Sequence, residues 1–223
     1  MSDELAATNR ARWNALVDAN IEYTRPMLDL TPDSARAFLA PLAIMGDVTG
    51  KEVLCLASGG GQQSVAFALL GAKVTVVDLS DKQLERDQQA ADHYGVSIRA
   101  LQADMRQLDA FADASFDAVY GSHVLEHLEP ATAKALLRDC FRIIKPEGIV
   151  RIAVPDLESI ARLYVASLEG ALKGDRAAEM RYDWIMLELL DQTVRKVSGG
   201  NMAALMAGSK DADQARFICE RIG

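Results

Sequence analysis

The sequence predicts an α/β protein built on a doubly wound, Rossmann-like parallel sheet, and three observations support this fold class. From Lys51 onward, short apolar segments alternate with helical patterns, as strands alternate with helices in such a sheet. The strand segments are almost continuously apolar, which is expected when helices cover both faces of the sheet. Finally, right-handed crossovers between parallel strands lead naturally to the doubly wound arrangement.

We divide the chain into three parts: an N-terminal helical cap (1–50), a Rossmann-like core (51–155) and a helical extension (156–223). In the core we expect strands at residues 52–57, 73–78, 97–101, 116–120 and 149–154, and helices at residues 63–70, 80–93 and 132–143. In the cap we expect one helix at residues 3–20 and a second that starts after Asp33 or Ser34 and stops before Pro41. In the extension we expect helices at residues 156–169, 175–197, 201–208 and 211–221, with no sixth or seventh strand.

Composition excludes several classes of protein. The chain has 223 residues, with 24 Lys and Arg against 32 Asp and Glu, and its net charge of -8 disfavours a general nucleic-acid binder. No apolar run approaches the roughly 20 residues that span a bilayer, and the first residues do not resemble a signal peptide. The three cysteines form no CxxC pair, so we expect a reducing, cytoplasmic location, with Cys55 buried in the core.

A glycine-rich turn follows the first strand. The run Gly59 to Gly61 allows a sharp turn and a close approach of ligand to backbone, and the helix behind it offers free N–H groups. Asp78 ends the second strand 19 positions after Gly59, an offset from which a carboxylate reaches the ribose hydroxyls of an adenosine. The turn alone fits a plain loop equally well, but together with Asp78 it predicts a nucleoside site.

Two further segments follow strands three and four. Asp104 could accept a hydrogen bond from an adenine amine while Met105 covers the ring, although a solvated turn explains Asp104 equally well. After strand four, residues 121–127 contain His123 and His127 in an H-x-x-E-H pattern that zinc peptidases also carry. Zinc peptidases place this pattern on a long helix, so we expect a loop beside the ligand crevice and no metal.

Taken together, these segments resemble the class I S-adenosylmethionine-dependent methyltransferases. The similar segments are the first motif at 53–61, the ribose-binding acid Asp78, the adenine contact Asp104-Met105, the fourth strand and its continuation at 116–127, and the turn into strand five at 143–148. The resemblance covers about residues 50–155, and the ordered set is far more specific than any one motif.

The resemblance implies an enzyme that transfers a methyl group from S-adenosyl-L-methionine to a small-molecule or sugar-type acceptor, leaving S-adenosyl-L-homocysteine. The cofactor-binding residues that it implies are Tyr23, Ala57, Ser58, Gly59, Gly61, Gln63, Asp78, Leu79, Asp104, Met105 and Ser122. For a hydroxyl acceptor, His123 is the candidate base, because histidine titrates near neutrality. The helical extension would build the acceptor pocket, through Arg162, Tyr164, Tyr182, Trp184 and Gln192, although Tyr164 and Trp184 also fit core positions.

The sequence departs from the family pattern at several points. Ala57 stands where the family usually has its first glycine, Cys55 where an acid is common, and Glu147 in place of another glycine. We therefore expect weakened rather than lost cofactor binding. The antiparallel strand pair that normally ends the family's sheet is missing, and the uncovered fifth strand would favour pairing of two copies. The two halves resemble different subgroups, with a join near residues 117–121, which suggests a chimera.

Two other functions remain open. An NAD-dependent oxidoreductase could use the same turn, as Gly59-x-Gly61-x-x-Ser64, together with Asp78, but it leaves Asp104 and the segment after strand four unexplained. A non-catalytic protein that retains only the cofactor pocket would also account for Ala57 and the missing strands.

Overall fold

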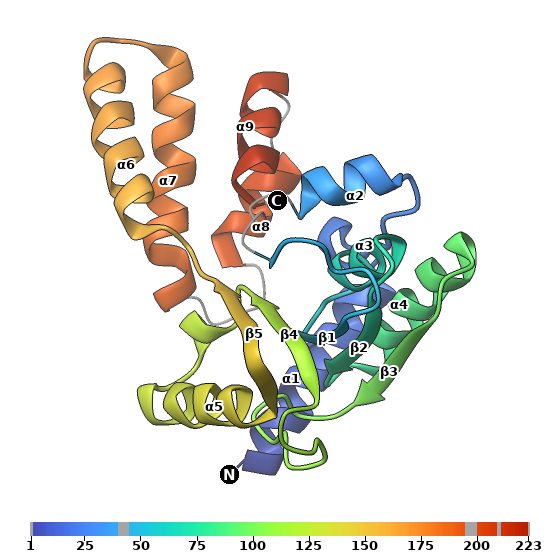
Figure 1. Cartoon of the computed structure of the whole chain (residues 1–223). Coiled ribbons are helices and arrows are strands. Elements are labelled where there is room, and N and C mark those ends of the chain that lie inside the picture. Colours follow the sequence, from blue (N-terminus) through green and yellow to red (C-terminus); the bar gives the residue numbers. More distant parts are fainter. Residues whose placement is uncertain (1, 40–44, 195–199, 209–210, 223) are drawn as a thin grey trace. The chain divides into compact units, whose positions relative to one another are not determined.

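A computed structural model describes residues 2–39, 45–194, 200–208 and 211–222 (Figure 1). The chain divides into two compact units, residues 1–154 and 155–223, each described by itself below. Across the described ranges, no helix combines the length and the apolar character that crossing a bilayer requires.

The first unit is built on a five-stranded sheet, as predicted. All strand pairs are parallel, in the order β3-β2-β1-β4-β5 (Figure 1). The strands are β1 (Glu52–Leu56), β2 (Lys73–Asp78), β3 (Ile98–Gln102), β4 (Phe116–Ser122) and β5 (Ile144–Ala153). This confirms the doubly wound fold class, and no strand follows β5 in the ranges that the structure describes.

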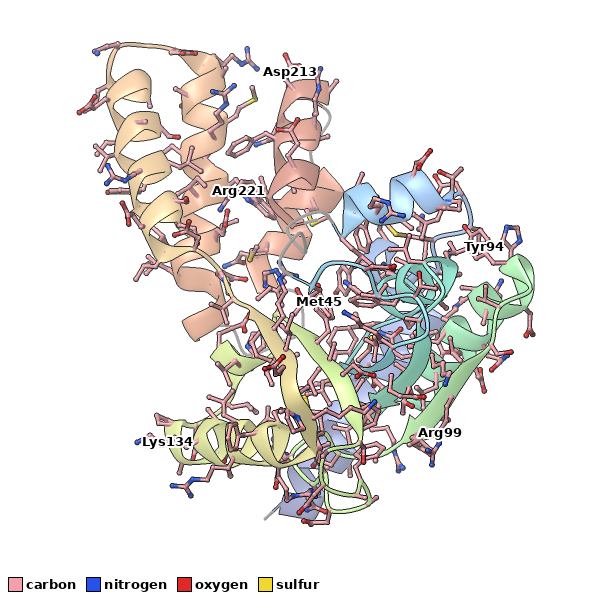
Figure 2. All side chains as sticks on the ribbon, viewed as in Figure 1. Met45, Tyr94, Arg99, Lys134, Asp213 and Arg221 are labelled. Atoms are coloured by element: carbon pink, nitrogen blue, oxygen red, sulfur yellow. The ribbon has the colours of Figure 1, made fainter. Side chains whose placement is uncertain are left out.

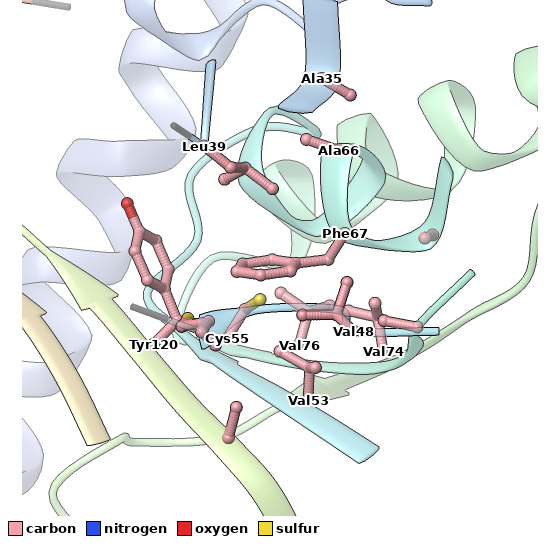
Figure 3. Packing of buried hydrophobic residues seen from close by; sticks show 14 of the residues in the cluster. Ala35, Leu39, Val48, Val53, Cys55, Ala66, Phe67, Val74, Val76 and Tyr120 are labelled. Carbon is pink, nitrogen blue, oxygen red and sulfur yellow. The ribbon is translucent and has the colours of Figure 1, made fainter. Parts of the chain in front are cut away.

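Helices cover both faces of this sheet. Helices α3 (Gln63–Leu69) and α4 (Asp81–Tyr94) lie on one face and α5 (Pro130–Ile143) on the other. Helix α1 (Ser2–Asp18) packs against α4 and α2 (Pro32–Phe38) against α3, and short 3-10 turns lie at η1 (Glu22–Thr24) and η3 (Leu125–His127). One core lies against α2, α3 and α4 and contains Phe67, which meets Tyr120 of β4 edge to face at 5.5 Å (Figure 3). Cys55 is fully buried there, as expected, and a second core packs α5 against the opposite face.

The fifth strand differs from the prediction, because it begins at Ile144 rather than at residue 149. The pairing with β4 passes from Phe116–Ile144 directly to Ala118–Ile149, so the residues between them form a bulge. The expected turn into the strand is therefore this bulge. Within it, Glu147 has a left-handed φ of 64°, and Lys145 Nζ lies 2.8 Å from Asp117 Oδ2.

The second unit is helical, as predicted, and consists of α6 (Leu157–Leu172), α7 (Arg176–Val194), α8 (Gly200–Gly208) and α9 (Ala212–Ile222). Trp184 is fully buried in its core, and its indole N–H donates to Glu188 Oε2 at 3.1 Å. The guanidinium of Arg221, labelled in Figure 2, binds the same carboxylate. Trp184 is thus a core residue rather than a side chain open to an acceptor. The side chain of Gln192 lies outside the described residues.

Candidate cofactor site

The predicted site residues lie along the carboxyl edge of the sheet. From β1 the chain proceeds outward to β2 and β3, then returns to β4 on the other side of β1. The connections after β1 and β4 therefore leave the sheet on opposite sides, and open α/β sheets bind ligands at the carboxyl ends of such strands. The glycine turn follows β1 at this position, and Ser122 ends β4 beside it.

The turn after β1 has a left-handed backbone at most of its residues. Ala57 has a φ of 46°, and its N–H donates to the Val77 carbonyl at 2.8 Å. Gly59, Gly60 and Gly61 have φ values of 59°, 92° and 79°. Glycine adopts this conformation without steric cost, whereas the Cβ of Ala57 makes its conformation unfavourable. The residue that departs from the family pattern is thus a strained one.

The three glycines have different surroundings. A Cβ on Gly60 would lie 2.9 Å from the Thr24 carbonyl oxygen, and one on Gly61 would lie 2.7 Å from the Arg86 carbonyl oxygen. Gly60 and Gly61 are therefore packed against other parts of the chain. A Cβ on Gly59 would meet nothing closer than the Ala57 oxygen at 3.9 Å. Gly59 is therefore the glycine with room for a ligand to approach.

Asp78 lies next to Gly59. Its side chain is buried, and its Oδ1 accepts a hydrogen bond from the Ser80 N–H at 2.8 Å. Burial raises the pKa of Asp78 to about 6, while hydrogen bonds from the N–H groups of Ser80, Gly59 and Leu79 oppose the rise. The carboxyl thus lies within reach of the turn, in the position expected of a group that binds ribose hydroxyls.

Asp104 lies at the same edge, after β3. Gln102 pairs with Asp78, the Ala103 N–H donates to the Asp78 carbonyl at 3.0 Å, and Asp104 follows directly. Met105 packs against the core beneath β1 and β4. Asp104 and Met105, the two predicted adenine contacts, therefore directly follow Ala103, whose N–H is hydrogen-bonded to the backbone of Asp78.

Arg106 forms an ion pair with the carboxylate of Asp104, a contact that the sequence analysis did not predict. The Arg106 Nε lies 2.9 Å from both oxygens of Asp104. Burial tends to raise the pKa of Asp104, but the hydrogen bonds and charge of Arg106 outweigh it and lower the pKa. A carboxylate held in this way remains charged, and it has fewer free lone pairs to offer an adenine amine.

The segment after β4 forms a loop, as predicted. The His123 N–H donates to the Ala153 carbonyl at 3.0 Å, and its φ of 53° is left-handed. Its ring is exposed, with Nδ1 3.3 Å from Glu126 Oε1, while His127 Nε2 lies 3.9 Å from the same oxygen. Among the described side chains, no group of three or more His, Cys, Asp or Glu is arranged to hold a metal ion.

The N-terminal segment contacts the glycine turn through its backbone. Gln62 Nε2 donates to the carbonyls of Tyr23, at 3.4 Å, and Arg25, at 3.2 Å. The Met27 N–H donates to the Gly61 carbonyl at 3.2 Å. The ring of Tyr23 meets Trp13 edge to face at 6.3 Å. The backbone of Tyr23 is therefore held close to the turn by Gln62, and the roles of Tyr23 and Gln63 in cofactor binding remain predictions.

The hydroxyl of Tyr94, a residue labelled in Figure 2, fixes the continuation of this segment to α4. This hydroxyl accepts from the Leu30 N–H at 2.7 Å and donates to the Met27 carbonyl at 3.1 Å. The segment that lies on the glycine turn is thus attached to a helix of the core.

Asp87 of α4 is a buried polar residue that the sequence analysis missed. Its Oδ1 accepts from Ser64 Oγ at 2.5 Å and faces Ser58 Oγ at 3.4 Å. A signal was present, because Asp87 lies three residues after Leu84 and four before Ala91, and both of these are buried. That spacing places Asp87 on the inner face of the helix.

The chain is similar to known methyltransferases. Residues 54–152 match the family described as methyltransferase domain. The uncharacterized methyltransferase YbaJ of Bacillus subtilis is 32% identical over 156 residues, covering 66% of this chain and 60% of that protein. The ubiquinone biosynthesis O-methyltransferase of Chromobacterium violaceum is 33% identical over 124 residues, covering 56% of this chain and 52% of that protein.

A solved structure, the DhpI-SAM-HEP complex, superposes on the chain with a TM-score of 0.50 and 25% identity, covering 74% of this chain and 70% of that one. The chain spans between about half and three fifths of the length of the two relatives above.

Proposed function

Because residues 54–152 form a domain of the class I S-adenosylmethionine-dependent methyltransferase family, we propose that this protein transfers a methyl group from S-adenosylmethionine to a small-molecule acceptor. The observation that carries the proposal is the buried carboxyl of Asp78 beside the open side of Gly59. Burial of this acid is costly, the N–H groups of Ser80, Gly59 and Leu79 offset only part of that cost, and two hydroxyl donors from a ribose would offset more of it. The residues present therefore fit an adenosyl group.

The cofactor supplies the reactive methyl group, on a sulfonium that is itself the leaving group. The protein binds the cofactor and the acceptor, orients them, and excludes water from the site. We assign the ribose hydroxyls to Asp78, and the amino-acid end to the backbone beside Ser58 and Gly59. Met105 and Leu79 would flank the adenine. Asp104, already held by Arg106, contributes a fixed negative charge rather than two free acceptors.

We propose His123 as the base for an acceptor that carries a hydroxyl. Glu126 lies 3.3 Å from Nδ1, so it favours the tautomer with the proton on Nδ1 and leaves Nε2 free to accept a proton. The exposed ring follows directly after β4, at the carboxyl edge of the sheet. The ubiquinone biosynthesis O-methyltransferase relative supports an oxygen acceptor on a small molecule. A sugar-type acceptor is the second class that we would test.

Isothermal titration with S-adenosylhomocysteine, and separately with NAD, tests the proposed cofactor. We expect binding of the first and not of the second. Loss of a hydrogen-bonded charged group costs roughly 1.5–3 kcal/mol, so Asp78→Ala should weaken binding by about 10- to 100-fold. Asp92→Ala, an exposed acid on α4, is the matched control and should bind as the wild type does. Unchanged affinity in Asp78→Ala would exclude the ribose assignment.

Methyl transfer to a panel of phenols, small carboxylic acids and sugars then tests the activity. His123→Ala should bind S-adenosylhomocysteine normally but lose turnover, because the base acts on the acceptor. Binding of NAD instead would favour the oxidoreductase. Binding of S-adenosylhomocysteine without transfer to any acceptor would favour a protein that retains only the pocket. The cytoplasmic location and the pairing of two copies remain predictions from the sequence.

A further inference from the structure

Asp87 lies in a buried polar cluster behind the glycine turn. The residue has no exposed surface, and its Oδ1 faces two serine hydroxyls, Ser64 Oγ at 2.5 Å and Ser58 Oγ at 3.4 Å. Both serines are buried as well. The other oxygen, Oδ2, has no hydrogen-bond partner among the residues that the structure describes. Because a buried carboxyl is costly, this arrangement needs a compensating role.

The two serines belong to the two ends of the glycine turn. Ser58 lies just before the three glycines, and Ser64 lies in the first turn of α3. Through these two hydroxyls, one oxygen of Asp87 connects both ends of the turn to α4. The middle of the turn also lies against α4, since a Cβ on Gly61 would be 2.7 Å from the Arg86 carbonyl oxygen and 2.9 Å from Ala90 Cβ.

A second polar side chain of α4 faces the same turn. Gln83, one helical turn before Asp87, is buried, and its Oε1 has no partner in the described part of the chain. That oxygen would be 3.0 Å from a Cβ on Gly60. The rest of this face is apolar, with Leu84, Ala90 and Ala91 buried. Helix α4 thus directs its two buried polar side chains toward the glycine turn and packs elsewhere through apolar groups.

From this geometry we infer that Asp87 is a positioning residue for the cofactor: it holds the glycine turn in its binding conformation through Ser58 and Ser64, without touching the ligand. The inference rests on the proposed function. It explains why a carboxyl stands where an apolar residue would pack without a desolvation cost. The turn needs such support because Ala57 is strained and the backbone beyond it is left-handed.

The test uses the full chain with four variants: Asp87→Ala, Asp87→Asn, Ser64→Ala and Asp92→Ala. Asn keeps an oxygen that can accept from Ser64, whereas Ala removes it. We would measure the affinity for S-adenosylhomocysteine by calorimetry and amide hydrogen exchange of residues 58–64 in the ligand-free protein. The exchange measurement reports on the turn even if no ligand binds.

We expect Asp87→Ala to weaken binding by about tenfold and to speed exchange in the turn, with exchange in β1 and β2 unchanged. The affinity of Asp87→Asn for S-adenosylhomocysteine should lie within about threefold of that of the wild type. Asp92→Ala should match the wild type in both affinity and hydrogen exchange. If Asp87→Ala does not fold, Ser64→Ala still removes the shorter bond and should show the same two effects to a smaller extent.

The proposal is overturned if Asp87→Ala, or Ser64→Ala in its place, binds normally with unchanged exchange in the turn. It is also overturned if the exchange of the whole sheet rises equally, since that would mark a general packing role. If the wild-type protein does not bind S-adenosylhomocysteine, the proposed function fails, and the exchange of the turn still decides whether Asp87 holds it.

Discussion

Replacing Asp87 with asparagine should remove a pH dependence from the folding stability of this protein. Burial is the largest influence on this carboxyl and raises its pKa from 3.8 to about 7. The hydrogen bond from Ser64 opposes the rise, and the charge of Asp78 adds to it. The thiol of Cys55 also faces this region, but burial raises its own pKa, so it stays neutral. Asparagine has the same shape and no charge to lose.

Whether the free energy of unfolding rises or falls with pH depends on which state, folded or unfolded, binds the proton of Asp87 more tightly. A raised pKa means that the folded state holds the proton more firmly than the unfolded chain does. The resulting stability is fully present below pH 3.8 and is lost as the pH rises through about 7. For a shift of this size, the free energy of unfolding should fall by roughly 2–3 kcal/mol between pH 5 and pH 8 because of this one group.

Urea unfolding of the wild type and of Asp87→Asn at pH 5, 6, 7 and 8 measures this difference. The variant should gain roughly 2–3 kcal/mol relative to the wild type from pH 5 to pH 8. Taking the difference between the free energies of unfolding of the two proteins removes most of the contribution of Asp78, which titrates in both. Asp92→Asn, in an exposed position on the same helix, should follow the wild type at every pH. A constant difference between Asp87→Asn and the wild type would refute the reasoning.

Two further sets of substitutions test the backbone of the site. Ala57 and Glu147 have left-handed φ values of 46° and 64°, so glycine at either position should raise the free energy of unfolding by roughly 0.5–1 kcal/mol in urea titrations. The same change at Ala135, in helix α5, should lower it by about 1 kcal/mol, and a loss of stability at all three positions would contradict the assigned strain. Gly61→Ala should destabilise by roughly 2–3 kcal/mol in the same assay, because its Cβ would lie 2.7 Å from a carbonyl oxygen of α4. Gly59→Ala, with 3.9 Å of clearance, should cost less stability and mainly weaken binding of S-adenosylhomocysteine; equal stability losses for the two glycines would argue against an open side at Gly59.

The positions of the strands could be predicted from sequence because each strand is a local apolar run with its own breakers. The placement of Asp78 followed from the same logic, since the carboxyl ends of parallel strands share one edge. Glu147 was recognised only as an unusual residue in a turn. The structure makes it part of a bulge in β5, because pairing with β4 continues on both sides of that turn.

Which of the three glycines has free space beside it could not be predicted from the sequence. Gly59, Gly60 and Gly61 are equivalent in the sequence, and they differ only because Thr24 and Arg86, far away in the chain, pack against two of them. The pairing of Asp104 with Arg106 was within reach of sequence reasoning, since the two lie two residues apart, but the turn geometry that joins them was not.

The amino-acid sequence by itself determined the alternating strands and helices, the edge of the sheet where the predicted site residues gather, and the position of Asp78 at that edge. Only the tertiary structure decided that Asp87 lies buried against Ser58 and Ser64 and that Gly59 alone of the three glycines stays open. The reason is physical: periodicity fixes which face of an element turns inward, whereas the polar partners on that face come from segments that meet only when the chain folds.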